Sequence, residues 1–157
     1  MSQGVKKVLF FCLILSVLSV ADGQQAEQIG HVNTVFQLLG RDDQIVVEVF
    51  DDPKVLNVAC YVSRAVIGGI KGEIGVATDP SRMSIRCVQN GPIAFLAKID
   101  QSPEGEVIFT QAQNWAFKRL NISRMVDRRR KALIYLAWST ELIEGSYFNS
   151  IGVIPLK

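Results

Sequence analysis

The sequence predicts a mainly β protein, a single-domain sandwich or barrel-like antiparallel sheet with minor short helix. Apolar residues come in short runs that are rich in β-branched side chains, and Gly, Pro and Asp residues separate these runs. No Pro/Ser-rich linker, low-complexity tract or fixed-period repeat divides the chain. We therefore expect one globular domain over residues 22–157, preceded by the segment 1–21 that is treated below.

Six strands are expected, in chain order over residues 44–50, 58–63, 84–89, 106–110, 116–126 and 132–139. The first of these reads QIVVEVF and is followed by Asp51-Asp52-Pro53, a strong turn signal. In the third, alternate residues share a face, with Ile85, Cys87 and Gln89 on one side. A succession of such short strands favours an all-β architecture.

The last two expected strands are predicted to form a hairpin, because the charged residues 127–131 lie between them. In the segment 116–126, Leu120, Ile122 and Val126 all occupy even positions, which indicates one buried face. The segment 132–139 is apolar on both faces, which is typical of a central strand. Three stretches stay open: 32–39 fits a short helix or a strand, 68–77 fits a turn or two of helix despite its four glycines, and 94–99 is ambiguous.

The first 21 residues have the order of a cleavable secretory signal peptide. Lys6 and Lys7 precede an uncharged run over residues 8–20, and small residues, Ser19 and Ala21, occupy the positions that a signal peptidase reads. The run is shorter than the ~20 residues of a membrane-spanning helix. We expect cleavage after Ala21, or else after Gly23, and no membrane span thereafter.

Loss of this segment changes the charge of the chain. The full sequence has 17 basic and 15 acidic residues, and both Lys6 and Lys7 leave with the signal peptide. The remainder is neutral, so the alkaline pI is no argument for nucleic-acid binding, and none is expected. Acids dominate residues 22–54 and bases dominate 118–131, so these two regions either face each other or form solvated surface.

Two cysteines, Cys60 and Cys87, remain after cleavage. An isolated pair in an exported protein usually forms one disulfide. A metal or redox role is less well supported, since the chain has no CxxC spacing and a single histidine, His31. We therefore expect a structural disulfide and neither a metal nor a cofactor.

Several segments together resemble the CreA family. They are IG at 29–30 with TVF at 34–36, IVVEVFDDP at 45–53, NVACYVSRA at 57–65, GGIKG at 68–72, GPI at 91–93, ALIYLAWS at 132–139 and EGS at 144–146. The resemblance covers nearly all of the chain after the signal segment. It implies a small exported protein in the periplasm of a Gram-negative bacterium, and it supplies no catalytic residues to carry over.

Two groups of residues are candidate sites. The first is an expected anion site. Its glycines leave backbone amides accessible, and these amides, together with the side chains of Arg64 and Lys71, would hold a phosphate or carboxylate. Its residues are Ser63, Arg64, Gly68, Gly69, Lys71 and Gly72. Alternatively, this segment is a glycine-rich turn and Arg64 is a buried partner of Asp51 or Asp52. The second group is the carboxylate pair Asp51 and Asp52, which either has a chemical role or forms a turn.

The sequence offers little support for catalysis. It has no GxSxG or SxxK motif, and a serine triad would depend on the lone His31. We therefore expect a non-enzymatic, β-rich periplasmic module that binds an unidentified small ligand or a periplasmic protein. The alternative is a hydrolase that acts on cell-envelope substrates with carboxylates such as Asp51 and Asp52.

Overall fold

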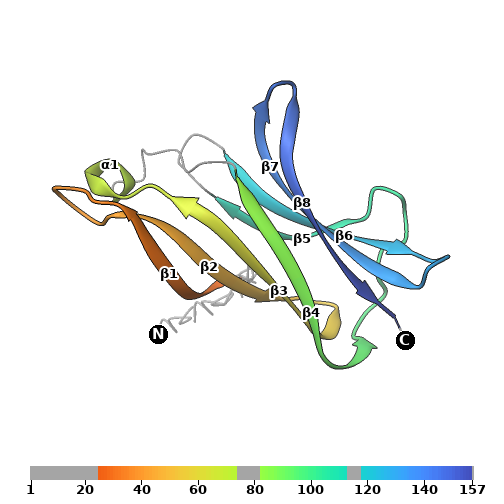
Figure 1. Ribbon diagram of the computed structural model, residues 1–157. Helices are drawn as coiled ribbons and strands as arrows, with labels where there is room; N and C mark the ends of the chain where they lie inside the picture. Colours follow the sequence, from red (N-terminus) through yellow and green to blue (C-terminus); the bar gives the residue numbers. More distant parts are fainter. Residues whose placement is uncertain (1–24, 74–81, 113–117, 157) are drawn as a thin grey trace, which may run out of the picture.

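The computed structural model describes residues 25–73, 82–112 and 118–156, so the expected signal peptide lies outside the described residues. Two four-stranded antiparallel sheets make up the fold (Figure 1). The first has the order β1-β2-β3-β4, with β1 at Glu27–Val35, β2 at Asp43–Asp51, β3 at Val55–Val66 and β4 at Met83–Phe95. The second has the order β5-β6-β7-β8, with β5 at Glu106–Ala112, β6 at Arg119–Asp127, β7 at Ala132–Ile143 and β8 at Ser146–Pro155.

The expected antiparallel β architecture is confirmed, in the form of two open sheets. Each sheet is a meander, in which every strand pairs with its neighbour in the sequence. Strand β7 lies between β6 and β8, as its two apolar faces predict, and residues 128–131 form the expected hairpin turn between β6 and β7. The one described helix, α1 at Gly69–Glu73, falls within the stretch 68–77.

The core lies between the two sheets, because alternate residues of each strand face inward. In β2, Gln44, Val46, Glu48 and Phe50 are buried, whereas the residues between them are more exposed. The ring of Phe50 stacks on that of Phe109 in β5, with the ring centroids 4.8 Å apart. Strand β4 also contacts β7 and β8, and so joins the first sheet to the second.

The expected disulfide joins Cys60 and Cys87, which lie directly opposite each other on β3 and β4. Both residues are buried, and β8 crosses over them at Gly152. A Cβ atom at position 152 would already lie 3.3 Å from the Cys87 sulfur, so glycine allows this close approach. The chain-entropy model assigns roughly 3.5 kcal/mol of stabilisation to a closed loop of this size.

The structure assigns two of the three open stretches, describes the third, 68–77, only as far as Glu73, and adds two strands. Stretch 32–39 is strand as far as Val35 and then turns, and β4 continues through Phe95 into the stretch 94–99. Strand β1 extends back to Glu27, and β8 had no counterpart among the six expected strands. Both lie at the end of a sheet and are largely exposed, so their residues lack the apolar alternation that marks a half-buried strand.

Candidate functional site

The segment 63–72 lines two separate hollows on the first sheet. Ser63 and Arg64, at the end of β3, border a shallow hollow of about 300 Å³. Gly68, Gly69 and Lys71 border a larger groove of about 440 Å³ between α1 and the turn that follows β1. The residues expected to form one anion site are thus divided between two places.

The side chain of Arg64 is directed at a carboxylate of its own sheet. Its Nε donates to Glu48 Oε2 at 2.8 Å and its Nη2 to Glu48 Oε1 at 3.0 Å. Both side chains are about nine-tenths buried, and Gln111 of β5 donates a further hydrogen bond to Glu48 at 3.1 Å. The structural partner of Arg64 is therefore Glu48 on the neighbouring strand, rather than Asp51 or Asp52 as the sequence suggested.

The backbone donors of the glycine-rich segment also have internal acceptors. Gly68 N–H donates to the Asp43 carboxylate at 2.8 Å, Gly69 N–H to the Arg41 carbonyl at 2.5 Å, and Gly72 N–H to the Gly68 carbonyl at 3.0 Å. An anion-binding nest needs such donors to be available to the ligand. These contacts do not favour an anion at this segment.

Close packing explains the glycines at 68 and 69. A Cβ atom on Gly68 would lie 1.9 Å from the carbonyl oxygen of Arg41, a distance that no side chain tolerates. Gly69 has a φ of +64°, in the left-handed region that favours glycine. The glycines therefore let α1 lie directly against the turn after β1.

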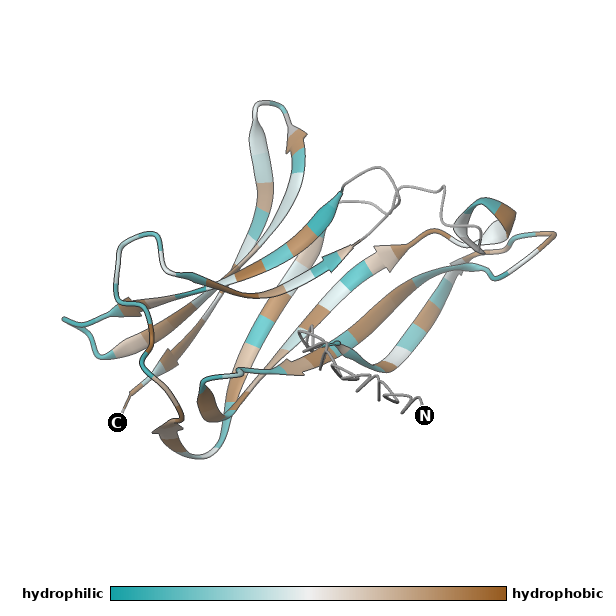
Figure 2. Ribbon diagram, turned by 180° about the vertical axis from the view of Figure 1, so that it is seen from behind, coloured by the Kyte–Doolittle hydropathy of each residue, from teal (hydrophilic) through white to brown (hydrophobic). Residues whose placement is uncertain are grey.

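The groove beside α1 is mainly apolar. Its lining residues are Gln37, Leu38, Leu39, Ile67, Gly68, Gly69, Ile70 and Lys71. Leu38 and Leu39 are 85% and 63% exposed, and the adjacent Phe36 is 77% exposed. Figure 2 shows hydrophobic colouring on α1 and on the turn beside it. Large exposed apolar side chains that gather around a hollow are typical of an interaction site.

Two acidic side chains hold this turn in place. Asp42 accepts a hydrogen bond from the Gln37 N–H at 2.9 Å, and Asp43 accepts one from the Gln37 side chain at 3.0 Å. Asp43 also accepts the Gly68 N–H, so it joins the turn to the start of α1. Polar contacts therefore fix the backbone, while Phe36, Leu38 and Leu39 stay exposed. Sequence analysis missed this turn, although the run FQLL next to Gly40 is an available signal.

Asp51 and Asp52 do not act as a pair in this fold. Asp51 is exposed, whereas Asp52 is buried. Asp52 Oδ1 accepts the Lys54 N–H at 2.8 Å, which is the local turn contact that the sequence Asp-Asp-Pro favours. The other side-chain contacts of Asp52 reach across to the second sheet.

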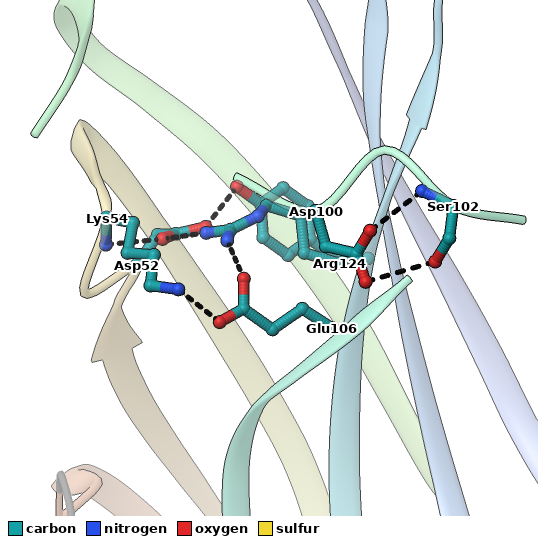
Figure 3. A network of polar contacts seen from close by, with 7 residues as sticks. Asp52, Lys54, Asp100, Ser102, Glu106 and Arg124 are labelled. Atoms are coloured by element: carbon teal, nitrogen blue, oxygen red, sulfur yellow. Dashed lines mark hydrogen bonds and ion pairs between the residues drawn. The ribbon is translucent and has the colours of Figure 1, made fainter. Parts of the chain in front are cut away.

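Arg124, on β6, is the buried cation that forms an ion pair with Asp52 (Figure 3). Its side chain is fully buried, and its two terminal nitrogens contact Asp52 and Glu106, the latter at 2.7 Å. The Tyr135 hydroxyl donates to the second Asp52 oxygen at 2.8 Å. Lys54 pairs with Glu106 at the edge of this network. Only Nε of the guanidinium has no hydrogen-bond partner.

Burial and charge shift two pKa values in this network. Burial, together with the adjacent Asp52 carboxylate, raises the pKa of the Tyr135 hydroxyl well above its usual value, so Tyr135 stays a donor. The hydrogen bond from Lys54, with the charges of Lys54 and Arg124, lowers the pKa of Glu106. Nearby, Asp100 accepts the backbone N–H and the hydroxyl of Ser102 at 2.8 and 3.0 Å, which lowers its pKa (Figure 3).

Two further features of the sequence, His31 and the basic run at 128–131, lie at the surface. His31 lies exposed on β1. Within residues 25–73, 82–112 and 118–156, no three His, Cys, Asp or Glu side chains gather in a way that would hold a metal ion. In the same part of the chain, no helix has the length and hydropathy needed to cross a membrane. The bases at 128–131 form the exposed tip of a hairpin.

Comparisons with known proteins identify the family. The sequence pattern of the family described as CreA protein matches residues 29–157. The chain belongs to the CreA family. It is 47% identical to Protein CreA of Escherichia coli strain K12 over 145 residues, which cover 92% of each chain, and the same values hold for Protein CreA of Escherichia coli O157:H7. No solved structure matches the chain.

We predict that replacing Arg124 strongly destabilises the protein. Arg124→Met would leave Asp52 as a buried charge without its cation, a change that typically costs about 3–5 kcal/mol. Denaturant unfolding measures this loss. The matched control is Arg119→Met, which changes an exposed arginine on the same strand and should leave the unfolding midpoint nearly unchanged.

A second variant keeps this prediction testable if Arg124→Met fails to fold. The double variant Arg124→Met, Asp52→Leu removes both charges and should be more stable than Arg124→Met alone, because no unpaired buried charge remains. Equal unfolding midpoints for Arg124→Met and the unmodified protein would contradict the structural role of this pair.

We also predict an acid-dependent loss of stability from Glu106. Its folded pKa lies below the unfolded value near 4.5, so its contribution is present above that value and is lost as the pH falls through the folded pKa. Urea midpoints measured from about pH 7 down to about pH 3 should therefore fall more steeply for the unmodified protein than for Glu106→Gln. Glu104→Gln, at an exposed position, is the control. Parallel curves for all three proteins would refute the prediction.

Proposed function

We propose that this chain is an exported, non-enzymatic binding module, and that a protein partner inserts apolar side chains into the groove beside α1. The exposed cluster of Phe36, Leu38 and Leu39 next to that groove carries the proposal. Soluble proteins seldom expose several large apolar side chains together unless another molecule covers them. Covering them would gain roughly 1.5–3 kcal/mol for each side chain that becomes fully buried.

The form of the surface favours a protein over a small ligand. Small-molecule sites are usually concave and surround most of their ligand. Here, Leu38 and Leu39 line the groove and yet stay 85% and 63% exposed. The backbone donors of Gly68 and Gly69, which also line it, already bind internal acceptors. A protein surface can fill the groove and cover its rim in one interface.

The carboxylates give little support to the hydrolase alternative. Asp52 is buried and bound to Arg124 and Tyr135, whereas Asp51 is exposed on the other face of its strand. Carboxylate catalysis needs two acidic groups that reach one substrate. We therefore keep the binding module as the proposed function.

We also propose that the partner is met in the periplasm. The order of charged, apolar and small residues in 1–21 is that of a cleaved signal peptide. The Cys60–Cys87 bond is consistent with export, since disulfides persist in oxidising compartments.

The groove proposal predicts that a charge at Leu39 abolishes partner capture. The affinity-tagged protein would be produced in its host, cross-linked in the periplasm, and its captured proteins quantified by mass spectrometry. For Leu39→Asp, we expect at least one partner to fall about tenfold, the effect of losing a typical interface hot spot.

Leu142→Asp is the matched control, because Leu39 and Leu142 are equally exposed at 63% and Leu142 lies on β7. It should retain the partner. A partner set that is unchanged in both variants, or reduced equally in both, would overturn the assignment to the groove.

The export proposal predicts a shortened chain. The intact mass of the exported protein should correspond to a chain that begins at Asp22, or at Gln24 if cleavage follows Gly23. The same measurement after treatment with an alkylating reagent under denaturing, non-reducing conditions should show no added mass at Cys60 or Cys87. A mass that retains residues 1–21 would contradict the proposed cleavage.

A further inference from the structure

Strand β1 lies at the end of the first sheet. It pairs with β2 on one side, and no strand among the described residues pairs with its other side. Eight of its nine residues are exposed, and the ninth, Gly30, is half-buried. We propose that a second copy of this chain occupies that edge, with the two β1 strands antiparallel about a two-fold axis, so that two four-stranded sheets become one continuous sheet.

The edge lacks the usual protection against strand pairing. Soluble proteins commonly guard an edge strand with proline, lysine or other charges. Residues 27–35 read EQIGHVNTV and contain no proline, lysine or arginine, and Glu27 is their only formal charge at neutral pH. The central residues, His31 to Asn33, pair regularly with β2, and the two irregularities of register lie toward the strand ends. The free side therefore presents an ordered row of backbone donors and acceptors.

Two-fold symmetry fixes the register of this pairing. If the full length of β1 is used, its central residue, His31, lies opposite itself, and Glu27 of each copy lies opposite Val35 of the other. A parallel arrangement would instead place the two Glu27 carboxylates side by side. The antiparallel arrangement is thus the one that avoids like charges directly opposite each other.

Charge complementarity supports a second copy as the occupant. The end of β1 at Val35 leads into the turn that packs against α1, and α1 carries the exposed Lys71. The antiparallel pairing brings Glu27 of one copy toward this end of the other, and symmetry provides the same attraction twice. Two carboxylates, Asp42 and Asp43, also lie at this end, but they are partly buried and accept hydrogen bonds from Asn33, Gln37 and Gly68 within the chain. Lys71 is exposed, so we expect it to be the charged side chain that meets Glu27 of the second copy.

The apolar side chains beside the edge supply the contact area that backbone pairing lacks. Specific dimers bury about 1,200–2,000 Å² in total, more than two short strands cover by themselves. Ile29, Val32 and Val35 are each more than half exposed, and Phe36 extends the apolar surface past the strand end. Each side chain contributes twice in a symmetric dimer. This inference goes beyond the proposed function, because it concerns the purified chain without its partner.

Sedimentation equilibrium of the purified exported protein tests the proposal, from about 1 μM to about 1 mM, the range of weak to moderate association. We expect a monomer–dimer equilibrium in that range. A chain that stays monomeric throughout overturns the proposal. Partner capture is a separate measurement, so a failure of the dimer does not count against the groove, nor the reverse.

A charge exchange tests the antiparallel register. Glu27→Lys and Lys71→Glu should each raise the dimer dissociation constant several-fold, because each brings like charges together, and the double variant should return toward the unmodified value. Glu104→Lys makes the same charge change on the loop before β5 and should have no effect. If both single variants behave like Glu104→Lys, or if the double variant does not recover, the proposed pairing is overturned.

Discussion

The ion pair between Asp52 and Arg124 is the contact on which the arrangement of the two sheets depends. A fully buried guanidinium is tolerated only when carboxylates and hydrogen bonds replace the water it has lost. Asp52 comes from the end of the first sheet, whereas Arg124, Glu106 and Tyr135 belong to the second. The replacement therefore exists only when the sheets are docked in one particular position, whereas apolar contacts such as Phe50 on Phe109 would tolerate small displacements.

Glu48 is a second buried charged residue that links the two sheets. It accepts hydrogen bonds from Arg64 of its own sheet and from Gln111 of the other, and these contacts are directional. The two networks lie at different positions along β2, one at its end and one at its middle. Contacts at two separated points fix an angle between sheets as well as a position.

Much of the fold could be predicted from residue alternation. The even positions Leu120, Ile122 and Val126 of β6 predict a buried face, and the two apolar faces of β7 predict a central strand. The same alternation also contains a signal of the buried ion pair. Arg124 lies at an even position of β6, on the face predicted to be buried, and Asp52 follows the buried even positions of β2. A charged residue in phase with a buried face indicates a buried ion pair, but its partner depends on how the sheets dock, and alternation carries no information about that.

The candidate site is harder to predict, because local sequence does not show which acceptor a backbone N–H group binds in the fold. The motif GGIKG has the composition of an anion-binding loop, yet Gly68 and Gly69 serve the close contact between α1 and the preceding turn. That contact joins residues about 30 positions apart in the chain, so it could not be seen within the motif. The exposure of Leu38 and Leu39 could not be predicted either. Apolar residues are normally expected in the core, and only the fold shows which of them stay at the surface.

The meander topology of the sheets has a consequence for the order of folding. Within each sheet, every strand pairs with its neighbour in sequence, so both sheets can form from contacts of short sequence separation. Asp52 and Arg124, in contrast, are 72 residues apart and meet only when the two sheets dock. Loop closure makes such distant contacts slow to form. We therefore expect the contact between Arg124 and Asp52 to form late in folding, when the two sheets dock and exclude water from the guanidinium.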